Sequence, residues 1–440
     1  MSAVQQQPRS RRTSSQRAKS RGRTRSKPKT TAQQRAPRQT TTTRTPLTRA
    51  YPGRHLGPLP LTPVVAWQVA LGVLVIGLAA DHVVTSIVGG AAVVLVAVLT
   101  LVPAGGRPLW RWLRVWRAAR SRAKKAGPAL PHDPSLVPLR EWLPELELAS
   151  VAGKRGADEV GVLYDGLGYT VLLGPDREDL IASADPVTIP LAALASVGEA
   201  EGVRLTSAQL VVQTQPAPVA ALGNFGGHLA ASYTEINTEA APASVSWWIA
   251  LRLEPSRDGT ALTLDGEDAE AVRRALRTIV AWATKVLSSS GLPSRPLAKS
   301  EVREVLALTL GVDPHHRPTS LKARRTAESW KLWTCDGASH ITGWVRSWPR
   351  AGLPGMSKLL AAMAGLPVRA STASLAVSWA PDETLHWSGY VRVAADNPKV
   401  ARAAYRQLAK QAGRAKVGVS RLDGEQLPGV LATIPLGGGA

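Results

Sequence analysis

The sequence is poor in cysteine and in aromatic residues other than tryptophan: it has one Cys, one Phe and 14 Trp among 440 residues. A single cysteine, Cys335, excludes an intrachain disulfide framework and any thiolate-rich zinc or iron–sulfur site. The motif Gly-x-x-x-x-Gly-Lys-Ser/Thr of P-loop ATPases is absent, and so are His-Glu-x-x-His, Gly-x-Ser-x-Gly and Asp-x-Asp. We therefore predict no catalytic residue, no cofactor and no metal ligand.

Acidic residues are missing from two stretches that hold most of the excess positive charge. The net charge is +22, yet residues 1–55 carry 15 basic side chains and residues 107–125 carry 8, with no acid in either. The rest of the chain has 31 basic against 32 acidic side chains. The high isoelectric point therefore gives no evidence for a folded nucleic-acid-binding domain, and we expect no specific nucleic acid and no small-molecule substrate.

The first 58 residues lack apolar periodicity as well as acids. They are rich in Gln, Thr, Ser, Pro and Arg, a composition that cannot offset the entropy of ordering. We predict that residues 1–58 form a disordered basic tail, attracted to anionic lipids of the inner leaflet or to an acidic partner. Contact with RNA is a weaker alternative.

Long apolar runs occur once, at residues 64–102. One helix of that length would be about twice as long as the bilayer is thick, so the run must fold back. Asp81 and His82 are the best place for the turn, which gives a transmembrane hairpin (59–104) with spans 63–80 and 83–102. The basic flanks place the N- and C-termini in the cytoplasm by the positive-inside rule, in a multi-pass protein of the cell membrane. More than fifty residues precede the run, which argues against a cleaved signal peptide.

Tryptophan and arginine alternate directly after the second span. This pattern predicts a basic juxtamembrane helix at residues 105–128 that lies in the membrane interface. A helical stalk that prolongs the span is an alternative, and the two are compatible. The residues expected at the interface are Trp110, Arg111, Trp112, Arg114, Trp116 and Arg117.

The remaining 312 residues have the composition of a globular α+β domain. We predict one α+β unit at 129–330 and a second at 331–440, the second in the ferredoxin-like order βαββαβ. The expected elements of the first unit are strands 160–164, 169–173, 208–214 and 245–253, a helix at 265–288, and a helix to Leu310 capped by Ser300. Those of the second are strands 341–346, 372–379, 385–393 and 416–421, with helices 356–364 and 398–413.

A weak internal repeat relates the two predicted units. The segment 207–216 matches 372–381 at Ala, Leu, Val and Pro. Further along, Trp247 and Arg252 parallel Trp387 and Arg392, and Arg273 and Arg277 parallel Arg402 and Arg406. The spacing between the matched blocks differs, so chance similarity of strand–helix patterns is an equally good explanation.

Four features of the sequence are candidate binding sites, and each has a structural explanation that we prefer. His315-His316 lies in a Pro-flanked loop without further ligands, and Asp265-Gly-Glu-Asp268 is explained by the start of a helix. The loop 223–228 has no fixed anion-binding motif. Most of the tryptophans lie in or beside predicted strands, which favours cores and protein interfaces over a stacking platform for nucleic acid.

Taken in order along the chain, these features resemble the EccE family, a membrane component of the type VII (ESX) secretion machinery of actinobacteria. The resemblance rests on the hairpin, the Trp/Arg stretch, and the segments Gly161-Val-Leu-Tyr-Asp-Gly-Leu-Gly-Tyr-Thr-Val-Leu-Leu, Leu210-Val-Val-Gln-Thr-Gln-Pro-Ala-Pro and Trp248-Ile-Ala-Leu-Arg-Leu-Glu-Pro. It implies a non-enzymatic subunit of an inner-membrane complex with EccB, EccC and EccD, in which EccC is the ATPase.

The sequence therefore predicts a structural subunit of a protein export complex. The alternative is a membrane-anchored enzyme of the glycosyltransferase type, acting on sugar nucleotides or lipid-linked sugars through acids such as Asp165 or Asp265. The missing Asp-x-Asp motif argues against it.

Overall fold

In the computed structural model the chain divides into a first unit, residues 1–41, and a second unit, residues 42–440. The structure describes residues 55–56, 59–79, 83–104, 107–125, 135–153, 159–176, 191–215, 244–254, 269–313, 324–348, 354–379 and 384–438. The first unit, nearly all of the predicted basic tail, the loop 223–228, the acids at 265–268 and His315-His316 lie outside these residues.

Two apolar helices, α1 (Leu61–Ala79) and α2 (Val83–Leu101), pack against each other. Trp67 near the start of α1 donates a hydrogen bond to Thr100 near the end of α2, at 3.3 Å, so the helices run in opposite directions. Small residues bring them close: a Cβ on Gly89 would lie 2.6 Å from Leu74. By length and composition α2 is long enough to cross a membrane, whereas the apolar part of α1, Val64–Ala79, is shorter. The predicted turn residues Asp81 and His82 fall between the helices, outside the described residues.

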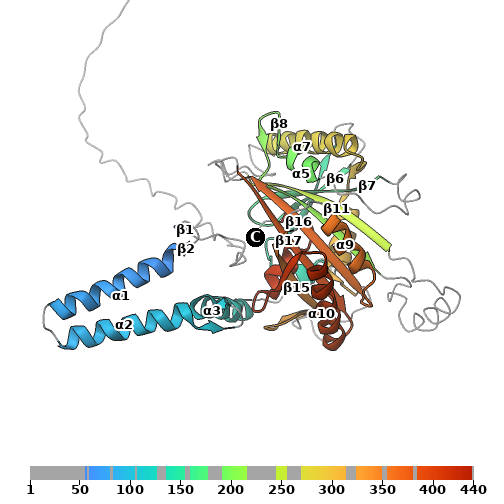
Figure 1. The fold of residues 1–440 in the computed structure, drawn as a ribbon. Helices are drawn as coiled ribbons and strands as arrows, with labels where there is room; N and C mark the ends of the chain where they lie inside the picture. Colours follow the sequence, from blue (N-terminus) through green and yellow to red (C-terminus); the bar gives the residue numbers. More distant parts are fainter. Residues whose placement is uncertain are drawn as a thin grey trace, which may run out of the picture. The chain divides into compact units, whose positions relative to one another are not determined.

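The residues that follow form a mixed α/β lobe around one large antiparallel sheet (Figure 1). Its twelve strands are β5 (Glu147–Ala152), β6 (Glu159–Tyr164), β7 (Tyr169–Pro175), β10 (Ser207–Gln215), β11 (Ser244–Leu253), β12 (Ser294–Pro296), β13 (Thr326–Glu328), β14 (Trp333–Cys335), β15 (Ala338–Ser347), β16 (Ala370–Trp379), β17 (Leu385–Ala395) and β18 (Gly418–Arg421). They pair in the order β13-β14-β15-β17-β16-β10-β11-β7-β6-β5, while β12 pairs with β7 and β18 with β15. Two-stranded ladders β1–β2 (His55–Leu56, Leu59–Pro60), β3–β4 (Pro103–Ala104, Arg107–Pro108) and β8–β9 (Glu199–Ala200, Val203–Arg204) stand apart from the sheet.

Helices cover both faces of this sheet. One face packs under α5 (Leu191–Ser196), α7 (Ala269–Ser289), α9 (Pro354–Ala364) and α10 (Pro398–Arg414), and the other under α4 (Val137–Arg140), α8 (Lys299–Leu310) and α11 (Gln426–Leu431). Alternation along β10 shows why: Leu210 and Val212 point to the first face, and Val211 points to the second. Because β10 is buried on both sides, it lies at the centre of the core.

The helices begin and end close to where the sequence places them, with one correction. The predicted cap Ser300 is wrong, because the N-cap of α8 is Ala298, two residues earlier, and the helix begins at Lys299. The backbone N–H of Ala298 instead donates to the Glu301 carboxylate, which also accepts from Arg295. Glu301, the third residue of the helix, thus satisfies the backbone N–H of the N-cap residue, as the acid of a capping box does. Asn397 caps α10, accepting from the N–H groups of Lys399 and Val400.

The two halves of the lobe follow the same path. In the first half, strands and helices run β7, α5, β10, β11, α7, β12, and the strands pair in the order β12-β7-β11-β10. In the second half the run is β15, α9, β16, β17, α10, β18, paired as β18-β15-β17-β16. The halves join where β10 pairs with β16, in a register that sets Leu210 opposite Leu375. These are the two leucines that the sequence repeat aligns.

Each half also buries one arginine at the same place in its ladder. Arg252 on β11 lies between Thr170 on β7 and Ser207 on β10. Arg392 on β17 lies between Thr342 on β15 and Thr372 on β16. Both arginines are 1% exposed, so they belong to the interior rather than to the surface.

Candidate functional site: the Trp/Arg helix and its dock on the lobe

Helix α3 (Leu109–Lys125) carries the alternating Trp and Arg residues and connects α2 to the lobe. It has no acid in its length, and its side chains segregate by face. Trp112, Val115 and Arg122 turn toward the lobe, and Arg111, Arg114, Trp116, Arg117 and Arg120 are exposed. The helix therefore has a docked face and a basic face.

The docked face is held by apolar packing around a tight turn. The ring of Trp112 lies 5.7 Å from that of Trp330, and Val115 is 1% exposed. Gly424 makes this approach possible: its φ is +77°, and a Cβ there would lie 2.6 Å from both Trp330 and Val115. A side chain at position 424 would force these groups apart.

A buried ion pair completes the dock. The Nε of Arg122 donates to a Glu328 carboxylate oxygen at 3.0 Å, and its Nη2 donates to the second oxygen at 3.1 Å. The same Nη2 donates to the carbonyl of Gly424 at 2.6 Å. Glu328 also accepts the backbone N–H of Leu427 at 3.1 Å. The side chains of Arg122 and Glu328 are 8% and 4% exposed, so this contact is shielded from solvent and links α3 to both β13 and the start of α11.

On the basic face, cations lie over tryptophan rings. The guanidinium groups of Arg111 and Arg114 are 5.2 and 5.8 Å from the Trp110 ring centroid, and that of Arg120 is 4.9 Å from the Trp116 ring. These cation–π contacts hold each tryptophan ring beside a positive charge on the same face of the helix. All six predicted interface residues lie on α3, and among the described residues Trp112 is the one with a ring contact to the lobe, at Trp330. Their contact with lipid stays a prediction.

In the interior of the first half, Asp165 holds Arg252. Its carboxylate accepts from Nη1 at 2.8 Å and from Nη2 at 3.0 Å, and it also accepts the N–H groups of Leu167 and Gly168. Burial lowers the pKa of Arg252, but the charge of Asp165 more than offsets this, so the pKa is raised above its usual value. Asp165 is the candidate acid of the enzyme alternative, and in the structure its carboxylate is bound to the buried Arg252.

In the second half, Arg392 has no acid beside it among the described residues. Its Nη2 donates to the carbonyl of Thr309 and to Thr372 Oγ1, while its Nε and Nη1 have no partner there. Burial lowers the pKa of Arg392 to about 10. The aspartate after β14, Asp336, binds Arg325 instead. The two halves therefore share a ladder position but differ in how the buried charge is compensated.

Protonation of His340, next to Arg392, should make the stability of the lobe depend on pH. His340 is fully buried, and burial, together with Arg392 and Arg369, lowers its pKa well below 6.5. The unfolded chain binds this proton and the folded chain does not. The contribution of His340 to the free energy of unfolding is therefore complete above about pH 6.5. Below that pH the free energy of unfolding decreases, by up to about 1.4 kcal/mol per pH unit.

Urea unfolding between about pH 7.5 and pH 5 measures this slope. The variant His340→Gln should flatten it, and His386→Gln, which changes an exposed histidine on β17, should leave it as in the wild type. Equal slopes for the wild type and His340→Gln would contradict the assignment.

The other candidate sites from the sequence yield little. Within the described part of the chain, no group of three or more His, Cys, Asp or Glu side chains could hold a metal ion. Cys335 is buried, and burial raises the pKa of its thiol far above the usual range, which disfavours the thiolate needed for reactivity. Asp265, the loop 223–228 and His315-His316 lie outside the described residues.

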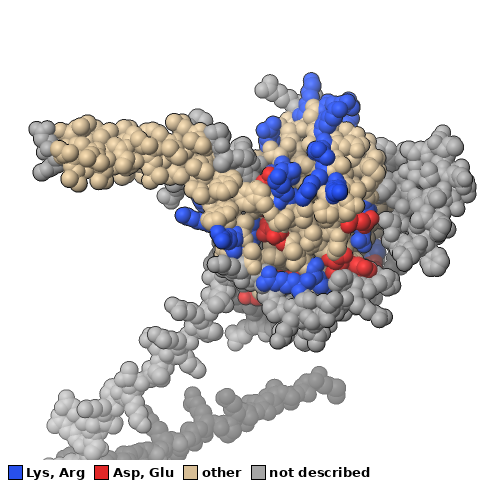
Figure 2. All heavy atoms as spheres, turned by 90° about the horizontal axis from the view of Figure 1, so that it is seen from below, with Lys and Arg blue, Asp and Glu red and all other residues tan. Residues whose placement is uncertain are grey.

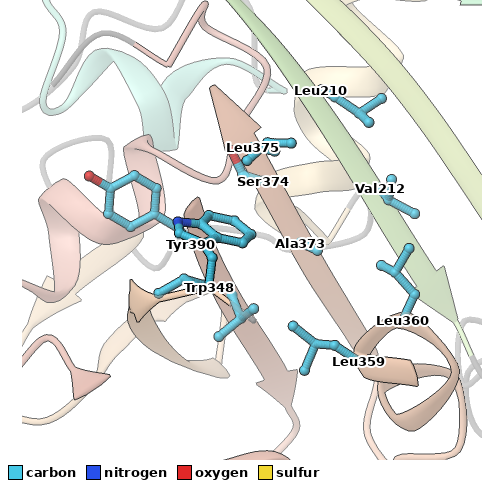
Figure 3. A pocket seen from close by; sticks show the side chains of 11 residues that line it. Leu210, Val212, Trp348, Leu359, Leu360, Ala373, Ser374, Leu375 and Tyr390 are labelled. Atoms are coloured by element: carbon cyan, nitrogen blue, oxygen red, sulfur yellow. The ribbon is translucent and has the colours of Figure 1, made fainter. Parts of the chain in front are cut away.

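A small pocket lies where the two halves meet, on the face covered by α9 (Figure 3). Leu210, Leu375 and Leu359 line it with other apolar side chains, and Trp348 and Tyr390 border it. Ser374, Trp348 and Tyr390 are the lining residues that carry polar side-chain atoms, and no charged side chain lines the pocket. The hydroxyl of Ser374 is already bound to Gln209. Such a wall does not suit a phosphate-bearing ligand such as a sugar nucleotide.

One charged surface escaped the sequence analysis. The exposed side of α10 carries Lys399, Arg402, Arg406, Lys410 and Arg414, with no acid on the helix. We call these five residues the basic stripe. Lys and Arg side chains gather on the face of the lobe seen from below, whereas the hairpin shows neither sign of charge (Figure 2). In the sequence, the spacing of three or four residues between these cations already indicates that they share one face of a helix. The net charge of the lobe, which is close to zero, does not reveal this local excess of positive charge.

Comparison with known proteins places one segment of the chain in a family. Residues 241–345, from the β11 region to β15, match the model of the family described as "Putative type VII ESX secretion system translocon, EccE". This segment includes the buried Arg252, the helices α7 and α8, and Glu328 of the α3 dock. No curated protein matches the chain. The match confirms the resemblance predicted from the sequence: residues 241–345 of the chain are similar to the EccE family of type VII secretion translocon components.

Proposed function

We propose that this chain is a non-enzymatic structural subunit of the type VII secretion inner-membrane complex, which anchors and stabilises the assembly. The observation that carries the proposal is the dock of α3, because it ties the lobe to a helix that continues from the apolar hairpin. The protein would then act by binding other subunits and not by catalysing a reaction. The family match supports membership of the translocon, and the partners would be EccB, EccC, EccD and anionic lipids.

The hairpin would anchor the protein by crossing the membrane twice. α1 and α2 have 19 residues each, about 28 Å of helix, close to the hydrocarbon thickness. The hydrogen bond from Trp67 to Thr100 and the close approach of Gly89 to Leu74 support insertion as a pair. The basic side chains of α3 favour the cytoplasm for the lobe.

The lobe would consist of two related βαββαβ units, near the boundary at residues 330 and 331 expected from the sequence. Three observations support this reading: the strand order that both halves share, the register that sets Leu210 against Leu375, and the equivalent positions of Arg252 and Arg392. In each half the fourth strand pairs with the first, the first with the third, and the third with the second, which is the ferredoxin-like arrangement.

The exposed face of α3 would lie in the lipid interface. A nitroxide attached to Trp116→Cys, in a Cys335→Ala background and with the whole chain in lipid nanodiscs, should be shielded from a water-soluble nickel relaxation agent and accessible to oxygen. The matched control is Trp282→Cys on α7, because Trp116 and Trp282 are 37% and 38% exposed. Equal accessibility of both labels to nickel would refute the interfacial placement.

Assembly is tested by extracting the chain from its native membranes in mild detergent and measuring the mass of the intact particle. A large complex containing other type VII subunits supports the proposal. A chain that runs alone and turns over a sugar nucleotide would instead establish the enzyme alternative.

A further inference from the structure

The outer face of α10 is a continuous row of unneutralised cations. At 100° per residue the basic stripe occupies a sector about 120° wide, and it is about 22 Å long. The two other residues in that sector, Ala403 and Gly413, are small, and every residue of the sector is exposed. The opposite face of the helix, with Ala401, Leu408 and Ala412, is buried against the sheet. The helix is fixed in place by its apolar side, and all the charge that it presents to solvent is positive.

The equivalent helix of the first half does not share this property. In the repeat, Arg273 and Arg277 of α7 correspond to Arg402 and Arg406 of α10. In α7 both arginines lie beside Glu270, with Arg273 at 3.9 Å and Arg277 in direct contact. The same offset places Lys399 of α10 at the position of Glu270. The first half therefore neutralises these arginines within the helix, and the second half replaces the neutralising acid by another cation.

No acid from elsewhere in the described lobe compensates the basic stripe. None of its five side chains forms an ion pair with a residue that the structure describes. The acid nearest along the chain after α10, Asp423, binds Arg421. Five cations spaced three or four residues apart repel each other at similar distances. A partner that supplied the missing carboxylates would relieve this repulsion.

The features of α10 favour an acidic protein segment over lipid or nucleic acid. A helix that enters a membrane surface turns its apolar face to lipid, but that face of α10 is inside the core. Sequence-tolerant binding of single-stranded nucleic acid relies on exposed aromatic rings, and the aromatic residue of α10, Tyr405, is buried. Ala403 and Gly413 leave room for a second helix to approach between the cations. Arginines at three of the five positions can bind carboxylates with two parallel hydrogen bonds.

We propose that the basic stripe of α10 binds an acidic helix of another protein subunit. The inference deepens the proposed function, since it names a contact surface and the chemistry of its partner. The partner helix would carry Asp or Glu at intervals of three or four residues, so that its carboxylates match the cations in register.

A synthetic probe tests this chemistry directly. The probe is an Ala-based helical peptide as long as α10 with Glu at every fourth position, compared with the same peptide carrying Gln. Fluorescence anisotropy with the full chain in detergent should show binding of the Glu peptide only. The charge reversal R402E/R406E should weaken it about tenfold or more. The matched control R273E/R277E, at the equivalent positions of α7, should bind as the wild type does.

Three results would overturn the inference: equal binding of the Glu and Gln peptides, equal binding by R402E/R406E and the wild type, or an equal loss in the α7 control. Tighter stripe-dependent binding of poly-uridine, or of phosphatidylcholine vesicles containing phosphatidylglycerol, would assign the surface to nucleic acid or lipid instead. Circular dichroism and the thermal midpoint of R402E/R406E establish that the variant is folded.

In native membranes the same variant separates this inference from the proposed function. If wild-type chain does not co-purify with other type VII subunits, the proposed function fails whatever the peptide shows. If it co-purifies and R402E/R406E does so to the same extent at physiological salt, the proposed function stands and the inference fails. A photoreactive residue at Ala403 should crosslink to an acidic segment of a protein subunit, and crosslinking to lipid alone would contradict the proposal.

Discussion

Replacing Arg252 with methionine is expected to destabilise the lobe by about 3–5 kcal/mol, because it leaves the buried carboxylate of Asp165 without its cation. The pair is 1% and 2% exposed at its side chains, so water cannot replace the lost hydrogen bonds. Asp165 would keep the N–H groups of Leu167 and Gly168, which is too little to hold a negative charge in the interior. Urea unfolding of the full chain in detergent, followed by tryptophan fluorescence, measures the loss.

Arg392→Met is the matched control, since the two arginines occupy equivalent positions. Here no acid among the described residues is left unpaired, and the variant removes a cation that burial disfavours. We expect little loss or a gain in stability. A loss as large as that of Arg252→Met would show that Arg392 has a counter-charge that the described residues do not supply. Asp165→Asn should lose nearly as much as Arg252→Met.

Replacing Arg122 with methionine is expected to release α3 from the lobe. The variant removes both hydrogen bonds to Glu328 and the bond to the Gly424 carbonyl, and it leaves Glu328 buried with the N–H of Leu427 as its partner. By the same reasoning, the docked state loses about 3–5 kcal/mol. An undocked 17-residue helix is marginally stable in water, so its backbone amides should exchange faster with solvent.

Hydrogen exchange with mass spectrometry measures this release along α3 and around Leu427. Glu328→Gln should increase exchange in the same two regions. Arg120→Met, a change on the exposed face of the same helix, should leave both unchanged. Unchanged exchange in Arg122→Met would show that the contact between Trp112 and Trp330 holds the helix without the ion pair.

Local patterns in the sequence predicted most elements of the lobe well. The expected strand at 208–214 is Ser207–Gln215, and the expected helix at 398–413 is Pro398–Arg414. Both depend on periodicity, a property of neighbouring residues. The start of α8 was misplaced because its N-cap residue is an alanine, which has no side-chain acceptor, whereas Ser300, two residues later, is a residue type that usually caps helices. The first turn is instead stabilised by the Glu301 carboxylate, which Arg295 holds.

Contacts between distant residues could not be predicted in the same way. Asp165 and Arg252 are 87 positions apart, and Arg122 and Glu328 are 206 apart. An arginine in a strand ordinarily indicates a solvent-facing position, so the burial of Arg252 and Arg392 was not expected. The docked face of α3 was missed for the same reason, since only the fold brings Glu328 and Gly424 to it.

The net charge of the lobe does not reveal the charged surface of α10. An average over the lobe is close to zero because the acids lie on other elements, while α10 holds none. The distribution of charge around each predicted helix, rather than its sum over a domain, would have identified the basic stripe.

The ladder between β10 and β16, which runs without a break from Ser207 opposite Ser378 to Thr214 opposite Ser371, has a mechanical consequence. Domains that flex usually meet at a short linker with few bonds across it. Here a bend between the halves would have to tear a row of backbone hydrogen bonds at the centre of the protein. The two halves are therefore expected to move together as one rigid body. Relative motion within the molecule is expected at positions outside the β10–β16 ladder.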